Sequence, residues 1–251
     1  MNVISKSFKA YSFLILILAI SAAVVSVMPM GMEIQGMENM QLPAPPLVIA
    51  LANFFIMIIV YGGLGIVGIF LGEKTIIPDL WNDKITNKQR FIIPFIIGSV
   101  CGLFMIATDQ LFFHFTDLDH IPHPIFPASV FASATAGIGE EIIFRLFFIS
   151  FWLWLIGKVL FKAKHYQTIY WVLAVFSILL FTGAHLPSVI LLYDIKDVSN
   201  FPVNLLLEVF IINAIVSFAT IWYFKKNGIL AAILIHFWAD IIWHTAYGFF
   251  T

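Results

Sequence analysis

Charged residues are scarce in this chain. Only 11% of its 251 residues are Asp, Glu, Lys or Arg, against about 25% in a typical soluble domain, and 61% are hydrophobic, with a mean hydropathy of +1.00. The few charges nearly cancel, to a net charge of −1. Because nucleic-acid binding depends on an excess of Lys and Arg, this composition excludes both a nucleic-acid partner and an ordinary water-soluble enzyme.

Cysteine is also nearly absent. The single cysteine, Cys101, stands in an apolar run, so a disulfide within the chain is excluded. No internal repeat and no low-complexity segment interrupts the sequence. The length suffices for one helical bundle and leaves no room for a sizeable soluble domain.

Long apolar runs, by contrast, fill most of the sequence. A membrane-spanning helix needs about 20 mostly apolar residues, and the chain contains seven such runs, separated by short stretches with Pro, Gly, Asn or charge. The fold class predicted is an all-α, polytopic membrane bundle of about seven transmembrane helices. The segments are 8–30, 47–72, 91–113, 127–157, 168–186, 201–224 and 229–249.

The first apolar segment is too long for a cleaved signal peptide. It continues to Met30, beyond the 7–15 residues of a signal h-region. We therefore expect a retained anchor, and an integral multi-pass protein of the cell membrane whose surroundings are the lipid bilayer.

Lys and Arg alternate between the predicted connections. They occur at the N-terminus, between the second and third segments, between the fourth and fifth, and between the last two, whereas the intervening connections contain only Lys196. Cytoplasmic connections collect Lys and Arg. The pattern predicts that the N-terminus lies inside and the C-terminus outside.

Three ionisable residues stand in the middle of the fourth segment. A charge at bilayer depth costs about 2.5–3.5 kcal/mol on insertion scales, so Glu140, Glu141 and Arg145 call for a functional explanation. On a helix, Glu141 and Arg145 lie one turn apart on the same face, whereas Glu140 points about 100° away. We expect Arg145 to neutralise Glu141, and Glu140 to face a cavity or a neighbouring helix.

Two further segments place polar residues in hydrocarbon. Phe181 and His185 share a face of the fifth segment, and His236 and Asp240 lie one turn apart in the last. Taken singly, His185 reads as a helix-end residue, and His236 with Asp240 as a pair that fixes helix packing. Three segments that each place Glu, His or Asp in the membrane favour one shared functional site.

These residues carry a resemblance to a known family. Glu-Glu-x-x-x-Arg at 140–145, Phe-x-x-x-His at 181–185 and His-x-x-x-Asp at 236–240 resemble, in this order, the motifs of the CPBP family of CAAX proteases and bacteriocin-processing enzymes. The resemblance divides the chain into three N-terminal transmembrane helices with their connections, 1–125, and a catalytic core of four transmembrane helices, 126–251. It implies an intramembrane peptidase of the glutamate type.

The resemblance also implies a role for each matching residue. Glu140 would be the general base that activates a water, His185 would hold that water, and Glu141 with Arg145 would order the site. Independently of the family, a carboxylate base suits amide hydrolysis, and no Ser or Cys nucleophile accompanies the motifs. Direct attack by water is therefore the expected mechanism.

The third motif is expected to stabilise the oxyanion of the tetrahedral intermediate. By resemblance, His236 and the residue at 240 take this role, but this chain has Asp240 where the prenyl endopeptidases have Asn. An ionised Asp cannot donate a hydrogen bond to an oxyanion. Asp240 is either protonated or orients His236, and we expect the second role.

Other classes of function are compatible with the same residues. A zinc-dependent metalloprotease would use Glu140, His185 and His236 as ligands with an open fourth position; no metal or other cofactor is predicted, and zinc is the alternative. A proton-coupled transporter could use Asp109 and Glu208 as well. A non-catalytic membrane scaffold would keep the motifs for packing alone. Convergence of the motif side chains on one cavity would favour hydrolysis, and a string across the bilayer would favour transport.

Two polar features outside the motifs receive structural interpretations. The connection 114–123, with three His and two Asp, is predicted to be a solvated polar loop because no ligand spacing matches a closed metal site. Glu208 is predicted to be a hydrogen-bonded core acid, with Arg145 or a His as the alternative partner. The expected partner of the whole chain is a peptide or protein substrate, either lipidated or embedded in the membrane.

Overall fold

The computed structural model describes residues 3–31 and 44–250, and all regular structure within them is helical. Short stretches of wider, π-type turns (η1 to η4 and η6) interrupt the α-helices, and η5 and η7 are single 3₁₀ turns. The elements are α1 Val3–Val25, α2 Pro46–Ile56, η1 Met57–Tyr61, α3 Gly62–Gly72, η2 Lys88–Ile92, α4 Ile93–Phe115, α5 Ala128–Glu141, η3 Ile142–Phe147, α6 Phe148–Trp152, η4 Leu153–Leu160, α7 Tyr166–Leu192, η5 Val198–Asn200, α8 Val203–Asn227, α9 Ile229–Asp240, η6 Ile241–Ala246 and η7 Tyr247–Phe249.

Seven of the helical stretches are long and apolar enough to cross a membrane, which confirms the predicted fold class. Two ends differ from the prediction. The first helix stops at Val25 rather than near residue 30, because the residue before Pro29 is disfavoured in the α conformation. The fifth passes through Pro187 and continues to Leu192. Leu186 and Val189 beside the proline pack against the start of α8, which stabilises this continuation.

The outer surface of the bundle is apolar. Leu47 and Ile59 are each 70% exposed and Val100 is 57% exposed, and many other large apolar side chains are exposed along the helices. In water such a surface would cost about 25 cal/mol per Å², whereas lipid tails accept it. Together with the seven spans, it identifies an integral multi-pass membrane protein.

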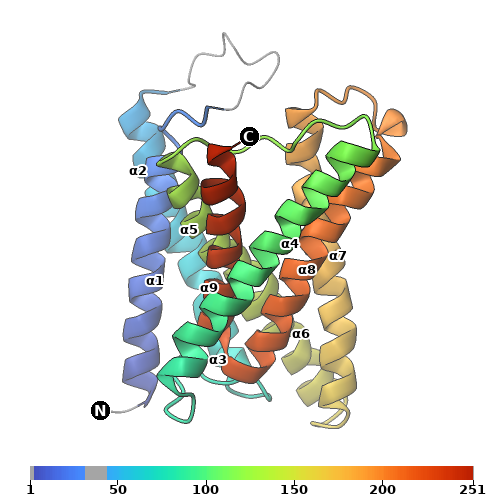
Figure 1. Cartoon of the computed structure of the whole chain (residues 1–251). Helices are drawn as coiled ribbons and strands as arrows, with labels where there is room; N and C mark the ends of the chain where they lie inside the picture. Colours follow the sequence, from blue (N-terminus) through green and yellow to red (C-terminus); the bar gives the residue numbers. More distant parts are fainter. Residues whose placement is uncertain (1–2, 32–43, 251) are drawn as a thin grey trace.

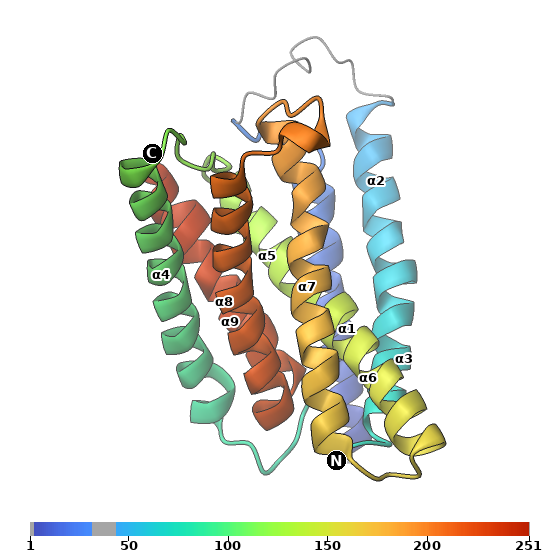
Figure 2. The ribbon, with the colours of Figure 1, turned by 90° about the vertical axis from the view of Figure 1, so that its right-hand side faces the viewer.

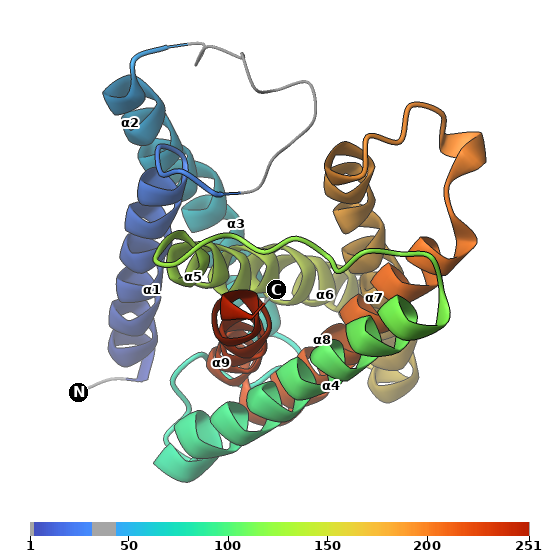
Figure 3. The same ribbon diagram turned by 45° about the horizontal axis from the view of Figure 1, so that its top comes forward.

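One long helix runs obliquely through the bundle. It is formed by α5, η3, α6 and η4 and spans Ala128–Leu160, and Figure 2 shows its slanted course behind α7. On one side it packs against α1 and α3, and on the other against α9, which also contacts α4 and α8. In the tilted view of Figure 3, α9 lies near the middle of the arrangement. The two halves of the chain thus meet along the long helix.

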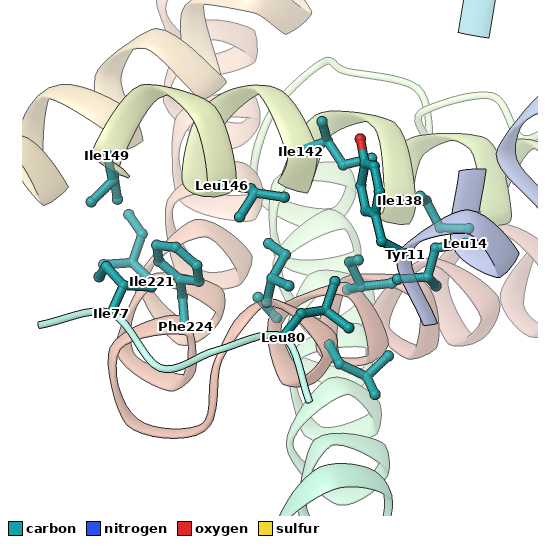
Figure 4. Close-up of a cluster of buried hydrophobic side chains, with 14 of the residues drawn as sticks. Tyr11, Leu14, Ile77, Leu80, Ile138, Ile142, Leu146, Ile149, Ile221 and Phe224 are labelled. Carbon is teal, nitrogen blue, oxygen red and sulfur yellow. The ribbon is translucent and has the colours of Figure 1, made fainter. Parts of the chain in front are cut away.

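The largest apolar core joins these elements near the end of the bundle where α1 begins (Figure 4). It contains Tyr11 from α1, Leu80 from the connection between α3 and α4, and Phe224 from α8. Ile142 and Leu146 enter it from the long helix, on the turns directly after Glu141. The core therefore fixes the segment that carries the paired acids.

Glycines in the second span allow close helix contact. A Cβ on Gly68 would collide with the backbone carbonyl of Leu146, and one on Gly65 would collide with the ring of Tyr11. Gly63 has open space around it and takes no part in this contact. Small residues let helices in lipid approach and gain dispersion contacts, and here they bring α3 against η3.

The orientation of the bundle stays a prediction, and it can be measured. Because the Lys- and Arg-rich connections are expected in the cytoplasm, a topology reporter fused after Thr251 should be active only in its external form. The same reporter inserted between Lys158 and Gln167 should be active only in its internal form. The reverse pattern at both positions would contradict the predicted orientation.

Candidate active site

The three motifs lie on three helices that meet inside the bundle. Glu140 and Glu141 end α5, His185 lies in α7, and His236 lies in α9. Small residues precede the two acids, and a Cβ on Gly137 would stand only 3.0 Å from the backbone nitrogen of Phe237. Without a side chain at this position, the backbone of α9 approaches α5 closely enough for His236 to reach the acids.

The carboxylate of Glu141 is the centre of a fully buried polar network. Its Oε2 lies 3.2 Å from Nε of Arg145, and its Oε1 lies 3.0 Å from Nδ1 of His236. A terminal nitrogen of Arg145 donates to the hydroxyl of Ser217 at 2.8 Å. Glu141 and Arg145 are both 0% exposed. The predicted pairing of these two residues is thus present, and the bond from Glu141 to His236 extends it to a third helix.

Phe181 forms an aromatic wall beside this network. The guanidinium of Arg145 lies over its ring at 4.4 Å from the centroid, and the ring of His236 meets it edge-on at 5.6 Å. Its backbone carbonyl lies 2.8 Å from Nδ1 of His185. A single residue therefore supports the arginine by a cation–π contact and fixes the orientation of the histidine.

Glu140 points away from the network, as the sequence predicts. Its side chain is 30% exposed, and its Oε2 has no hydrogen-bond partner among the residues that the structure describes. The nearest ionisable groups are Nε2 of His185 at 3.8 Å and Nε2 of His236 at 3.9 Å. Both distances exceed a direct hydrogen bond, and a water oxygen about 2.8 Å from each partner can bridge such a gap.

A cavity of ≈ 270 Å³ lies in front of Glu140. His185, His236 and Asp240 line it together with Glu140, whereas Glu141 and Arg145 stand behind it as supports. His185 and His236 each lie seven residues from a helix end, at opposite ends of the bundle, or about 10 Å inward at 1.5 Å per residue. The two rings nevertheless meet at one carboxylate, with their Nε2 atoms 3.8 and 3.9 Å from Oε2 of Glu140. The motif side chains therefore converge on one cavity and do not string out across the bilayer.

The hydrogen bonds fix which ring nitrogens face the cavity. A carbonyl oxygen only accepts, so Nδ1 of His185 carries a proton and its Nε2 faces Glu140 as an acceptor when the ring is neutral. Nδ1 of His236 likewise donates to the Glu141 carboxylate, and its Nε2 faces Glu140. Both histidines thus present Nε2 to the same carboxylate.

Asp240 lies on the opposite side of the His236 ring from Glu141. Its Oδ2 is 3.6 Å from Nε2 of His236, which is an ion-pair distance rather than a hydrogen bond. Glu141 bonds Nδ1 and so also orients the ring. The orienting role of Asp240 stays a prediction, and Glu141 is a second residue with that role.

The residues considered for zinc stand somewhat too far apart for a formed site. Ligand atoms at about 2.0–2.1 Å from a tetrahedral zinc ion lie about 3.3–3.4 Å from one another. Glu140 is 3.8 Å from His185 and 3.9 Å from His236. Within residues 3–31 and 44–250, no group of three or more His, Cys, Asp or Glu side chains has a geometry that could hold a metal ion.

Several residues around the site escape sequence reasoning. Ser217 binds Arg145, and Asn213 and His244 line the cavity, but none of them belongs to a motif. Ser217 and Asn213 lie on α8, where single polar residues in an apolar helix give no periodic signal. His244, two turns after His236 on the same helix, is the one that its spacing could have indicated.

Two structural interpretations of the sequence hold in part. Glu208 is a buried acid, 1% exposed, and it lies within hydrogen-bond reach of Asp109 rather than of Arg145. In the connection 114–123, Asp117 and Asp119 are exposed as predicted. His120 and His123 are not free in solvent, because His120 bonds Asp109 at 2.5 Å and His123 contacts His244 at 3.1 Å.

Truncating the arginine should unfold the network. Arg145→Ala leaves the carboxylate of Glu141 buried without its cation, and breaking such a pair costs about 3–5 kcal/mol. We expect both activity and thermal stability in detergent to fall. Ser217→Ala, which removes one neutral partner of the same guanidinium, should cost about 1–3 kcal/mol. Equal melting temperatures for Arg145→Ala and the wild type would contradict a structural role for the pair.

Comparison with known proteins adds one finding. Residues 122–242 match the family model described as Type II CAAX prenyl endopeptidase Rce1-like, a segment of just under half the chain that contains both acids, the arginine, both histidines and Asp240. No curated protein and no solved structure gives a significant match. The family match and the seven membrane spans agree with the resemblance of the motifs. The match over residues 122–242 therefore supports a relation to the CAAX proteases, a family whose description implies intramembrane endopeptidase activity.

Proposed function

We propose that this protein cleaves a peptide bond within the membrane by means of a water molecule that Glu140 activates. The observation that carries the proposal is the unpartnered Oε2 of Glu140, which faces Nε2 of two histidines across a cavity. This arrangement would supply a base at Glu140, a second group to hold the water at His185 and a donor for the oxyanion at His236.

The nucleophilic water would lie between Glu140 and His185. Both groups present acceptors, so the water donates one proton to each and directs a lone pair away from them. A peptide carbonyl in the cavity would meet that lone pair. Glu140 then takes the proton as the bond from water to carbon forms, and passes it to the nitrogen of the leaving amine as the peptide bond breaks.

His236 is suited to stabilise the oxyanion when its ring is protonated. Nδ1 is committed to Glu141, so Nε2 can donate only if the ring carries both protons. The surrounding charges favour that state, because three carboxylates and one guanidinium sum to −2 and an imidazolium reduces this to −1. One donor aimed at an oxyanion in a water-excluded site contributes about 10²–10³ in rate.

The substrate proposed is a peptide or protein segment at the membrane, lipidated as the family description suggests. Apolar side chains from α4 and α8, namely Met105, Val209, Ile212 and Val216, form much of the cavity wall. Such walls accept aliphatic substrate side chains, while the few polar groups at Glu140 fix the scissile bond.

Replacing the base without changing its size tests the mechanism. Glu140→Gln should lower the hydrolysis of a quenched, farnesylated CAAX peptide by at least about 10²-fold, the contribution of one general base. Its thermal stability should stay close to the wild type, because Oε2 makes no hydrogen bond that the amide would lose. Asp240→Asn is the matched control: it also removes one cavity carboxylate, but Asn can donate to the oxyanion and should retain substantial activity. A Glu140→Gln variant that keeps wild-type rates would exclude Glu140 as the base.

Metal removal separates the proposal from the zinc alternative. If Glu140 activates the water unaided, purified protein treated with a strong chelator and then dialysed should keep its rate on the same peptide. Added zinc should not raise it. Activity that disappears on chelation and returns with one equivalent of zinc would establish a metalloprotease instead.

A further inference from the structure

Three polar side chains of the cavity wall take no part in the proposed reaction. They are Ser188 of α7, Asn213 of α8 and His244 of η6. A peptide that enters a water-excluded cavity brings backbone N–H and C=O groups with it, and each of them costs free energy if it is buried without a partner. Ser188 is exposed, whereas Asn213 and His244 are partly buried in the wall. These two residues are therefore placed to meet the backbone of a bound peptide.

The amide group of Asn213 has one fixed end and one open end. Its Nδ2 donates to the carbonyl of Val209 at 2.8 Å, one turn earlier on α8. Because only the nitrogen of an amide can donate to a carbonyl, this contact also fixes the position of the oxygen. Oδ1 has no hydrogen-bond partner among the described residues, and it remains an acceptor on a side chain that lines the cavity.

His123 holds the ring of His244 through Nδ1. It lies in the connection between α4 and α5, which crosses the end of the bundle beside the last turns of the chain (Figure 1). Nδ1 of His123 is 3.1 Å from Nδ1 of His244, and the ring of His123 meets that of Trp243 edge-on at 4.6 Å between centroids. Burial lowers the pKa of His123 to about 4, so this ring is neutral. One of the two Nδ1 atoms therefore donates a hydrogen bond to the other.

The surroundings of His123 decide which ring donates. Its Nε2 is buried and meets no hydrogen-bond partner in the part of the chain that the structure describes. If Nδ1 of His123 accepted, its proton would be on this buried Nε2, and buried N–H groups without an acceptor are rarer in proteins than acceptors without a donor. His123 therefore donates to Nδ1 of His244. The proton of a neutral His244 is then on Nε2, which makes it a donor on a residue of the cavity wall.

Asn213 and His244 lie at nearly the same depth in the bundle. α8 and α9 run in opposite directions on either side of Gly228; Asn213 is 15 residues before this glycine and His244 is 16 residues after it. At 1.5 Å per residue both lie about 22–24 Å from the turn, whereas His236 lies about 12 Å from it. Because an extended peptide advances about 3.3 Å per residue, about three residues of substrate bridge this difference.

From this geometry we propose that Asn213 and His244 bind the backbone of the substrate within about three residues of the scissile bond. Nε2–H of His244 donates to a backbone carbonyl oxygen, and Oδ1 of Asn213 accepts from a backbone N–H. His123 is a positioning residue that keeps the proton of His244 on Nε2. That the ligand is a peptide rests on the proposed hydrolytic function, whereas the donor and the acceptor rest on the contacts of the cavity wall.

Contacts of this kind recognise the backbone of the substrate and not its side chains. Many residue types can occupy the position that faces Asn213, but proline lacks the N–H and is excluded there. The pair therefore sets one rule for the substrate sequence without reading a particular side chain.

Binding of an uncleaved peptide tests the pair. With Glu140→Gln, a fluorescent, farnesylated CAAX peptide stays intact, and its Kd is measured by fluorescence anisotropy in detergent. Adding Asn213→Leu or His244→Phe, each of which removes hydrogen-bonding groups and keeps a side chain of similar size, should raise the Kd about 10-fold. Asn53→Leu and His114→Phe are the matched controls and should leave the Kd unchanged. Asn53 also donates to the carbonyl one turn earlier, at 3.0 Å, but neither control residue lines the cavity.

Two results of this assay overturn the proposal. One is a Kd that stays unchanged in either Asn213→Leu or His244→Phe. The other is an equal rise of the Kd in the two control variants, which would reflect a general loss of packing.

Changing the peptide tests Asn213 without changing the cavity. In a set of peptides, each with an ester in place of one amide within about three residues of the scissile bond, one backbone N–H is missing at a time. One member should bind about 10-fold more weakly to Glu140→Gln. This loss should vanish when Asn213→Leu is added, because the N–H then has no partner to lose. If no ester weakens binding, or if the loss persists in Asn213→Leu, Asn213 is not the acceptor.

The same assay tests the positioning role of His123. His123→Phe keeps a ring against Trp243 and removes the hydrogen bond to His244, so the Kd should rise. In the variant with both His123→Phe and His244→Phe, the Kd should equal that of His244→Phe alone, since the donor that His123 positions is already absent. Losses that multiply would assign His123 a structural role only.

Binding and hydrolysis are measured separately, so the two proposals can fail separately. Absence of binding to Glu140→Gln contradicts the proposed pair. Binding that responds to the substitutions as expected, together with no hydrolysis by the unaltered chain, contradicts the proposed function alone.

Discussion

A carboxylate that is buried in a membrane protein must be neutralised, and the site depends on how Glu141 meets this constraint. One of its oxygens faces Arg145 and the other accepts from His236. Because the desolvation of an unpaired charge costs several kcal/mol, these contacts hold α5 and α9 in one relative position. Glu140, the next residue, is then directed into the cavity by the geometry of the helix. The structural acid thereby determines where the reactive acid points.

The first two membrane-spanning helices contribute to this arrangement without lining the cavity. α1 and α3 pack along the long helix, and Ile142 and Leu146, on the turns after the acids, are buried against residues from both halves of the chain. Gly68 permits the contact at Leu146. The family match begins only at residue 122. Helices that precede this residue nevertheless pack around the segment that carries the acids. The predicted division at residue 125 therefore marks where the sequence similarity begins, whereas the packing of the helices continues across it.

Much of the fold could be predicted from the sequence because lipid imposes a simple rule on composition. Seven apolar runs gave seven spans, and the pairing of Glu141 with Arg145 followed from helical spacing. Contacts between helices that are distant in the sequence could not be predicted in the same way. The partner of His236 was expected on its own helix, at Asp240, since spacing reveals only local neighbours, whereas Glu141 reaches it from α5. Pro187 was taken as a helix end because proline weakens helices, but packing of its neighbours on α8 outweighed this preference. Ser217 and Phe181 carry no pattern that marks them as supports of an arginine.

The wide turns that follow the acids have a consequence for how the sequence can vary in length. η3 begins directly after Glu141 and η6 directly after Asp240, and π-type turns contain an extra residue relative to an α-helix. Because a wide turn absorbs its extra residue, deleting one residue from 142–147 would close the turn to α geometry and leave the helix beyond it in register. A deletion before Arg145 would place the arginine three residues after Glu141 instead of four, and both spacings keep the two side chains on one face of the helix. Connections between spans tolerate insertions and deletions, and η3 is a place within a span where the loss of one residue should be tolerated as well.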